Sequence, residues 1–220
     1  MNAFMQFAEM VINENPLAKL AKEMTNKTMD IGELDKPLSI TDNAEKKGTR
    51  PLTEDEAKDL KEKTGWTDQQ IKKCTIDQDG VIHYKCDNEE LEGKTHEPSG
   101  VPYVRKTIDI NGVKVEVVVP EFDSMYDVQL PDELSKESNP RQFNECNKQL
   151  KNAIENDPDL NSQFSDEQIE DIMDGKTPEG YTWHHDAETG KMQLVETAKH
   201  DRTQGGAAHT GGKALWGGGY

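Results

Sequence analysis

Histidines gather at the C-terminal end of this 220-residue chain. Four of the six, His184, His185, His200 and His209, fall within the last 40 residues. Several imidazoles brought to one point favour zinc, manganese or nickel over calcium, which prefers oxygen ligands. If some rings hold a divalent cation and another stays free, the free ring takes a proton from water while the cation stabilises negative charge. These residue types therefore predict metal-assisted hydrolysis.

Two short β-forming runs and a helix start are expected to position these histidines. Tyr181 to His185 and Lys191 to Glu196 flank a turn at 186–190, which predicts a hairpin. Thr197 then begins a segment of helical character that carries His200. The expected unit has the order ββα, and it brings the strand and helix histidines to one point.

The adjacent pair His184-His185 poses a geometric problem. Neighbouring side chains in a regular strand point to opposite faces of the sheet. Both rings can therefore contact the same phosphate only if the strand ends or bulges at this point. The turn that begins at Asp186 allows the strand to end there. One imidazole would then bind the metal while the other acts on water.

The C-terminal sequence resembles a known family of nucleases. The resemblance rests on four groups of residues: Trp183-His184-His185, Met192-Gln193-Leu194-Val195, His200, and His209-Thr210-Gly211-Gly212. In this order they resemble the WHH branch of the HNH/endonuclease VII superfamily, found as toxin tips of bacterial polymorphic toxins. Upstream, VPEFDSMYDVQLP and NPRQFNECNKQL resemble the toxin regions of LXG-type proteins. Together the resemblance covers about half of the chain.

The resemblance implies a ββα-metal endonuclease with one divalent cation, which would be magnesium, manganese, zinc or nickel. It implies a toxin that acts in competition between bacteria and degrades DNA, with RNA as the alternative substrate. Such a protein is a secreted effector without its own signal peptide, acts in the cytoplasm of the target cell, and is neutralised by a cognate immunity protein.

Carried over residue by residue, the resemblance also implies roles for the C-terminal side chains. The metal ligands would be His184, His200 and His209. His185 would be the general base and, with His184, form the catalytic pair. The asparagine that names the HNH pattern has no obvious counterpart here, and Gln193 is the candidate for its place. Candidate substrate contacts are Gln193, Arg202 and Lys213.

Other interpretations of the same residues remain open. All four imidazoles could close around a structural zinc ion and leave no catalytic position, although structural zinc sites favour thiolates and this tail has no cysteine. The chain could instead be an acidic interaction module with an incidental histidine tail, or an RNase with the same site. His83 and His96 stand alone in sequence and are expected to lie outside the site.

Glycines and tryptophans near the histidines allow more than one role. Gly205-Gly206 and Gly211-Gly212 could cradle a phosphate with backbone N–H groups or could form turns. Trp183 and Trp216 could stack on bases, but a 40-residue module needs large side chains for its core, so core packing is favoured.

The charge of the chain is strongly acidic, with 43 acidic against 26 basic residues and a net charge of −17. Such a balance is unusual for a protein that binds phosphates. From residue 181 onward, however, four acidic and four basic residues balance one another in charge. The excess of acidic residues therefore lies upstream. This asymmetry indicates an acidic scaffold that precedes the chemical part.

The bulk composition narrows the class of protein further. No run approaches the ~20 apolar residues that cross a bilayer, and the N-terminus lacks the features of a secretory signal. Three cysteines, Cys74, Cys86 and Cys146, do not predict a disulfide framework. Cys74 and Cys86 flank a predicted hairpin and could pair across it, or both could be reduced thiols.

Between the ends, the sequence predicts hairpins and amphipathic helices. CTIDQDGVIHYKC contains a hairpin around Gln78-Asp79-Gly80, and Asn111-Gly112 separates two alternating runs in a way that suits a type I′ turn. Capping boxes begin helices at Thr53 and Ser165. Asn139-Pro140 begins a further helix as N-cap and first residue.

The fold class expected from this pattern is α+β with a C-terminal ββα-metal unit. Residues 1–52 read as a helical fragment and polar linker, 53–180 as an acidic α+β scaffold, and 181–220 as the nuclease unit. This division is compatible with a single hydrophobic core shared by the scaffold and the site.

Overall fold

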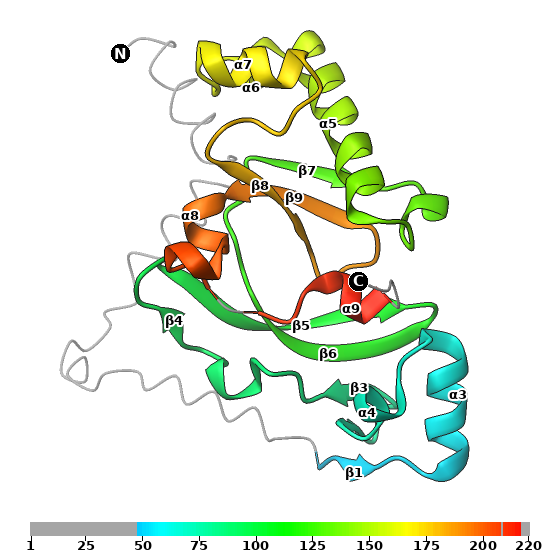
Figure 1. Cartoon of the computed structure of the whole chain (residues 1–220). Coiled ribbons are helices and arrows are strands. Elements are labelled where there is room, and N and C mark those ends of the chain that lie inside the picture. The colour runs from blue at the N-terminus through cyan, green and yellow to red at the C-terminus, as the bar shows by residue number, and fades with distance from the viewer. Residues whose placement is uncertain (1–47, 208, 217–220) are drawn as a thin grey trace, which may run out of the picture. The chain divides into compact units, whose positions relative to one another are not determined.

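A computed structural model describes residues 48–207 and 209–216 of the chain. These residues lie in a compact unit that spans Lys46–Tyr220 and is shown in Figure 1. The helical fragment and linker expected for residues 1–52 fall, as far as residue 47, outside the described residues. The described part is a mixed α+β structure, as the sequence predicts.

The larger of two sheets contains six strands in the order β1-β2-β3-β6-β5-β4. Only the pairing of β3 with β6 is parallel among the described strands, and the others are antiparallel. The strands are β1 (Arg50–Pro51), β2 (Cys74–Ile76), β3 (Ile82–Tyr84), β4 (Thr95–His96), β5 (Val101–Ile110) and β6 (Val113–Pro120).

The long β5–β6 hairpin contributes the most extensive strand pairing of this sheet. Its turn residues Asn111 and Gly112 have φ angles of 52° and 81°, as a type I′ turn requires. Eight residue pairs join the strands from Tyr103↔Pro120 to Ile110↔Val113. The hairpin predicted at Asn111-Gly112 is therefore confirmed, as is the smaller β2–β3 hairpin.

Two helices accompany the N-terminal strands: α3 (Glu54–Thr64) and α4 (Asp68–Ile71). Thr53 caps α3 in a capping box with Glu56, as predicted. Thr67 and Gln70 form a second such box at the start of α4.

The smaller sheet has three antiparallel strands in the order β7-β9-β8. β8 (Tyr181–His185) and β9 (Lys191–Glu196) form the predicted hairpin with unchanged boundaries, and β7 (Tyr126–Gln129) pairs with the other edge of β9. The remaining elements at this end are the helices α8 (Thr197–His200) and α9 (Gly212–Trp216) and the 3₁₀ turn η4 (Arg202–Gln204). The predicted ββα order is thus present, with a helix of one turn.

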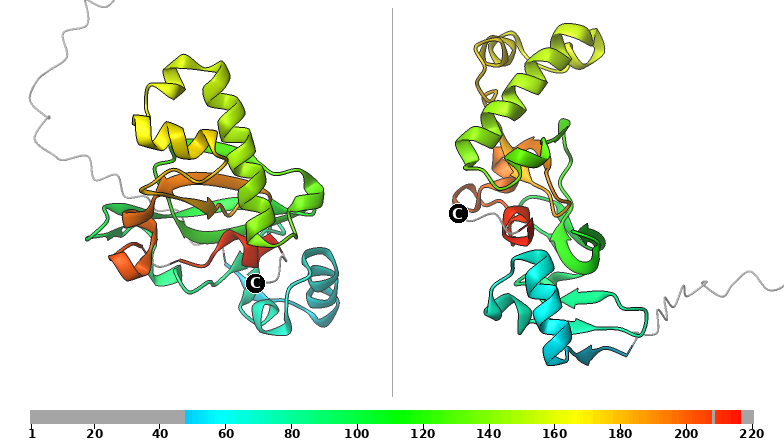
Figure 2. Two further views of the ribbon diagram at one scale, coloured as in Figure 1. Left: turned by 45° about the horizontal axis from the view of Figure 1, so that its top comes forward. Right: turned by 90° about the vertical axis from the view of Figure 1, so that its right-hand side faces the viewer.

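A helical layer covers one side of the small sheet (Figure 2). It consists of α5 (Asn139–Asn156), α6 (Pro158–Asn161) and α7 (Asp166–Met173), preceded by the 3₁₀ turn η3 (Asp132–Leu134); a further turn, η2 (Glu89–Leu91), lies near β4. Ser165 begins α7 with the predicted capping box. The N-cap expected at Asn139 was wrong by one residue, because Ser138 occupies that position in extended conformation.

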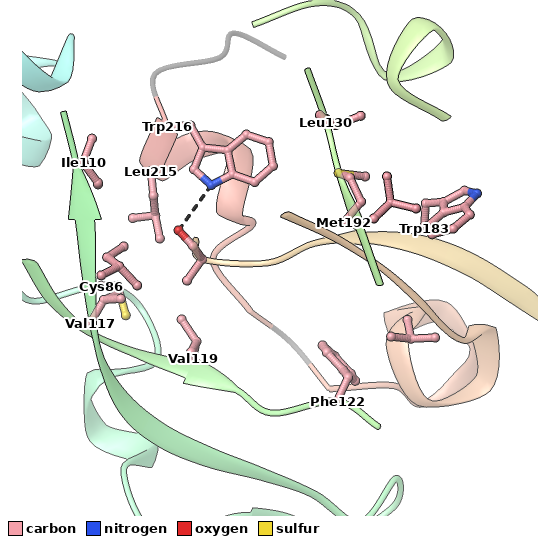
Figure 3. Close-up of a cluster of buried hydrophobic side chains, with 14 of the residues drawn as sticks. Cys86, Ile110, Val117, Val119, Phe122, Leu130, Trp183, Met192, Leu215 and Trp216 are labelled. Atoms are coloured by element: carbon pink, nitrogen blue, oxygen red, sulfur yellow. Dashed lines mark hydrogen bonds between the residues drawn. The ribbon is translucent and has the colours of Figure 1, made fainter. Parts of the chain in front are cut away.

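The buried side chains of both sheets and of α5 form one hydrophobic cluster. Figure 3 shows Trp216 between residues of the large sheet, such as Ile110 and Val117, and residues of the small sheet, such as Met192. Trp183 and Trp216 are both 2% exposed, so the core role favoured for them is confirmed. Cys74 and Cys86 are buried free thiols and do not pair.

The C-terminal helix α9 is anchored by residues from near the start of the described chain. The indole nitrogen of Trp66 donates to the carbonyl of Leu215 at 2.7 Å, and Gln70 Nε2 donates to the carbonyl of Ala214 at 3.1 Å. Trp66 is 1% exposed and packs on Tyr84. The position of α9 therefore depends on the α3–α4 region.

This anchor predicts that Trp66→Phe lowers the free energy of unfolding by about 2–3 kcal/mol, because it opens a cavity and leaves a buried carbonyl without a donor. Urea denaturation of the full chain measures the change. Lys63→Ala, which removes an exposed pair with Asp59, is the control and should change it by less than about 0.5 kcal/mol. Equal effects of the two substitutions would show that the anchor contributes nothing.

Candidate metal centre

Three of the four C-terminal histidines converge in the structure. His184 lies on β8, His200 ends α8, and His209 precedes α9. One nitrogen from each ring lies within 4.8 Å of the others, and His200 Nε2 is 3.2 Å from His184 Nδ1. The three ring centroids are 4.8 to 5.1 Å apart.

This donor set fits a divalent transition metal. Ligand nitrogens around a tetrahedral zinc ion lie ~3.3 Å apart, given Zn–N bonds of ~2.0–2.1 Å. The 3.2 Å separation of His184 and His200 already matches this value, and a small inward movement of the third ring would complete the set. Three histidines also leave a fourth position free, as catalytic zinc sites do.

Hydrogen bonding assigns one of the ligand atoms. His209 Nδ1 lies 3.0 Å from the carbonyl oxygen of Ala207. Because a carbonyl only accepts, Nδ1 carries the hydrogen and Nε2 keeps its lone pair. A carbonyl partner of this kind is the usual way in which a metal-binding histidine is oriented.

The ring of Phe122 forms an apolar wall against all three imidazoles. Its centroid is 4.8 Å from that of His184 and 5.5 Å from those of His200 and His209. Phe122 follows β6 and is 6% exposed. The three rings are therefore held by packing on one aromatic side chain as well as by hydrogen bonds.

Two glycines allow the backbone to approach the hairpin closely. A Cβ atom at Gly206 would lie 2.5 to 2.8 Å from backbone atoms of Lys199, His200 and Asp201, and one at Gly212 would overlap the carbonyl of Asp186. Neither position tolerates a side chain without backbone movement. Gly206 and Gly212 therefore allow close packing of the backbone on either side of His209.

His185 faces a different set of residues from His184. The five residue pairs that join β8 to β9 are regular, without a bulge, and β8 ends at His185. His185 Nε2 lies 2.9 Å from Gln142 Oε1 on α5. Its ring packs against Phe143 and Trp216, with centroids 5.6 and 5.5 Å away. His184 thus belongs to the three-histidine group, while His185, the last residue of β8, stays outside it.

Burial keeps the four imidazoles neutral. It lowers the pKa of His184 well below its usual value, with further lowering from His209 and His200. Burial also lowers the pKa of His185 and of His200 to about 4, and that of His209 below its ordinary range. Neutral rings are the form that binds metal or accepts a proton.

The predicted substrate contacts occupy unequal environments. Gln193 pairs opposite His184 and donates to Asp127 Oδ1 at 3.3 Å. Arg202 lies exposed in η4. Lys213 is 3% exposed, and its ammonium donates to the Glu137 carbonyl at 2.6 Å and to Asn139 Oδ1 at 2.8 Å. Their substrate roles stay predictions.

Sequence reasoning missed three residues at the site: Phe122, Gln142 and Lys106. Lys106 Nζ on β5 is 3.7 Å from Asp186 Oδ2, and its charge adds to the lowering of the pKa of His184. All three come from elements that precede the histidines by some 40 residues or more along the chain. Only tertiary packing brings them together, so no local pattern reveals them.

The two remaining histidines form separate contacts. His83 lies between Asp77 and Glu116, with nitrogen–oxygen distances of 3.4 and 3.1 Å. His96 Nδ1 is 2.8 Å from Ser99 Oγ. Neither belongs to the metal-ligand group found among the described residues.

Comparison with known proteins agrees with the nature of the site. The family model of the DNase/tRNase domain of colicin-like bacteriocin matches residues 111–211. No curated protein and no solved structure matches the chain significantly. None of the described helices combines the length and the apolar character that crossing a bilayer requires. The matched span includes all four C-terminal histidines, and the match supports a nuclease toxin domain that hydrolyses nucleic acid.

Proposed function

We propose that the protein is a metal-dependent, nonspecific endonuclease toxin of the HNH type, which acts on DNA. The observation that carries this proposal is the convergence of three neutral imidazoles, one buried and two half-buried, beside a fourth that stays outside the group. Residues 181–220 would supply the site and residues 53–180 the scaffold.

His184, His200 and His209 are the proposed ligands of one divalent cation. When bound, the cation would stabilise negative charge on the phosphate oxygen and on the leaving group. A closed structural zinc site is disfavoured, because the fourth imidazole is hydrogen-bonded to Gln142 and not gathered with the other three. Which divalent cation binds, among magnesium, manganese, zinc and nickel, stays a prediction. Three nitrogen donors suit manganese, zinc and nickel better than magnesium.

His185 is the proposed general base. Its lowered pKa of about 4 means that the ring is neutral near pH 7 and free to accept a proton. Burial is the largest cause of that lowering, and the charge of Lys213 is the next. Transfer of a proton from water to this ring would leave a hydroxide that attacks phosphorus.

The match to a bacteriocin domain supports delivery between competing bacteria and neutralisation by a cognate immunity protein. Both remain proposals, as does the secreted route. The family's printed description covers both DNase and tRNase domains, so RNA is the second candidate substrate. Phosphodiester chemistry of this kind does not itself distinguish the two sugars.

Cleavage of plasmid DNA tests the proposal directly. The purified full chain is incubated with plasmid or with tRNA, each with magnesium, manganese, zinc, nickel or chelator. We expect nicking of plasmid only with metal, and a loss of at least about 100-fold in rate for His185→Ala, because a positioned base contributes that much.

His96→Ala is the matched control, since it removes an imidazole far from the cluster in sequence and outside the metal-ligand group. It should cleave as the parent chain does. Cleavage of tRNA alone would redirect the proposal to RNA. No cleavage of either substrate with any of the four metals would leave an interaction module as the better account.

Burial of the cluster also predicts how the stability of the metal-free protein depends on pH. The pKa of His200 is lowered to about 4, by burial first and by His209 second. As pH falls through ~6.5 the unfolded chain takes up a proton at this residue while the folded protein does not, so stability present above ~6.5 is lost on acidification. From pH ~7 to pH ~5 this ring should cost about 1 kcal/mol after allowance for partial exposure.

His200→Gln isolates that contribution from the many carboxylates. Urea denaturation in chelator at neutral pH and at about pH 5 should show a smaller fall in unfolding free energy for the variant than for the parent chain. An identical fall in both proteins would mean that burial does not lower the pKa of His200.

A further inference from the structure

Gln142, on the first turns of α5, is completely buried and hydrogen-bonded at both ends of its amide. Its side-chain nitrogen lies 2.8 Å from the carbonyl oxygen of Leu134 and 2.9 Å from that of Ser135. Its side-chain oxygen lies 2.9 Å from His185 Nε2. A buried amide with three partners is held in one orientation.

The two carbonyls determine which end of the amide faces His185. A carbonyl oxygen only accepts hydrogen bonds, so the NH₂ group of Gln142 must face Leu134 and Ser135. Reversing the amide would place its oxygen against two carbonyl oxygens and forfeit both bonds. Gln142 Oε1 therefore faces His185.

This orientation determines the proton position on His185. Since Gln142 Oε1 has no hydrogen to give, the hydrogen of the 2.9 Å contact belongs to His185 Nε2. The neutral ring then carries its lone pair on Nδ1. Within residues 48–207 and 209–216, nothing hydrogen-bonds to that atom.

Surrounding contacts hold the same arrangement rigidly. Phe143 and Trp216 pack on the ring of His185. The buried ammonium of Lys213 ties α9 to the chain at Glu137 and Asn139, just before and at the start of α5. The helix that carries Gln142 and the helix that carries Trp216 therefore hold His185 together.

We propose that Gln142 is a positioning residue for the nuclease reaction, which holds His185 as the Nε2–H tautomer and directs Nδ1 to the attacking water. This inference rests on the proposed role of His185 as general base. The water gives its proton to Nδ1, its oxygen forms the new bond to phosphorus, and the ester oxygen leaves and takes a proton from solvent. The imidazolium then keeps its Nε2–H bond to Gln142, which strengthens because the donor is charged.

Nuclear magnetic resonance of the full chain labelled with ¹⁵N-histidine tests the tautomer without any assay of activity. Long-range ¹H–¹⁵N spectra are recorded in chelator and again with one equivalent of zinc. We expect His185 to be the Nε2–H tautomer in both, with an Nε2–H proton that exchanges slowly with water. An Nδ1–H tautomer in the parent chain would overturn the proposal, whether or not the protein cleaves DNA.

Three variants separate the His185 contact from the loop contacts. Gln142→Met should lose the protected Nε2–H proton and lower kcat on a fluorescent DNA duplex by at least about tenfold, as loss of an orienting partner does, with KM within about twofold. Gln142→Glu keeps an acceptor opposite Nε2 but sets its second oxygen against the carbonyls of Leu134 and Ser135. Provided that its spectra show a folded protein, it should retain the Nε2–H signal and a kcat closer to the parent. Gln149→Met, the same change on the same helix away from His185, should alter neither.

The outcomes are distinct. If Gln142→Met changes the His185 signals but leaves kcat unchanged, or if a folded Gln142→Glu protein loses the Nε2–H signal as Gln142→Met does, the positioning role is wrong. If the parent chain cleaves no nucleic acid, the proposed function fails, while the tautomer spectra still decide how Gln142 and His185 are bonded.

Discussion

The site depends on two close backbone contacts, of Gly206 with α8 and the residue after it, and of Gly212 with the β8–β9 hairpin. Gly206 lies against the backbone of α8, and Gly212 against the carbonyl of Asp186, at distances that exclude any side chain. This contact returns His209 to the strand that carries His184. α8 itself is a single turn, Thr197–His200, and contributes His200 at its end.

The C-terminal residues share one hydrophobic core with the rest of the compact unit. α9 packs between the two sheets (Figures 2 and 3), with the indole of Trp216 bonded to the carbonyl of Ala187. Trp66, from the opposite end of the described chain, holds the carbonyl of Leu215. α5 then closes the other side through Gln142 and Asn147, the latter accepting a bond from the indole of Trp183. The scaffold therefore does more than carry the histidines, since its side chains hydrogen-bond to His185 and to the neighbouring Trp183.

Local features of this fold follow from local sequence. The capping boxes at Thr53 and Ser165, the turn at Asn111-Gly112 and the β8–β9 boundaries all appear as predicted. Each depends on residues within a few positions of one another, where side-chain chemistry and backbone conformation are directly linked. The error at the start of α5 is also local, because Ser138 and Asn139 are neighbours and both residue types favour the N-cap position.

Long-range features did not follow from sequence. Nothing near Tyr126 indicates that β7 pairs with β9, some 65 residues later, and nothing near Phe122 indicates that its ring contacts three histidines. The clustering of histidines predicted a metal group, but the partners that orient them, such as Gln142, become visible only in three dimensions. The acidic excess likewise lies in the scaffold, while Lys106 on β5 and Lys213 on α9 bring positive charge to the histidines.

X-ray absorption and anomalous diffraction on the full chain loaded with zinc would measure the central claim most directly. One ion per chain, bound by nitrogens of His184, His200 and His209 with an oxygen ligand completing the sphere, is the expected result. An ion enclosed by four protein ligands, or one bound elsewhere in the chain, would contradict an open metal centre and the hydrolysis that depends on it.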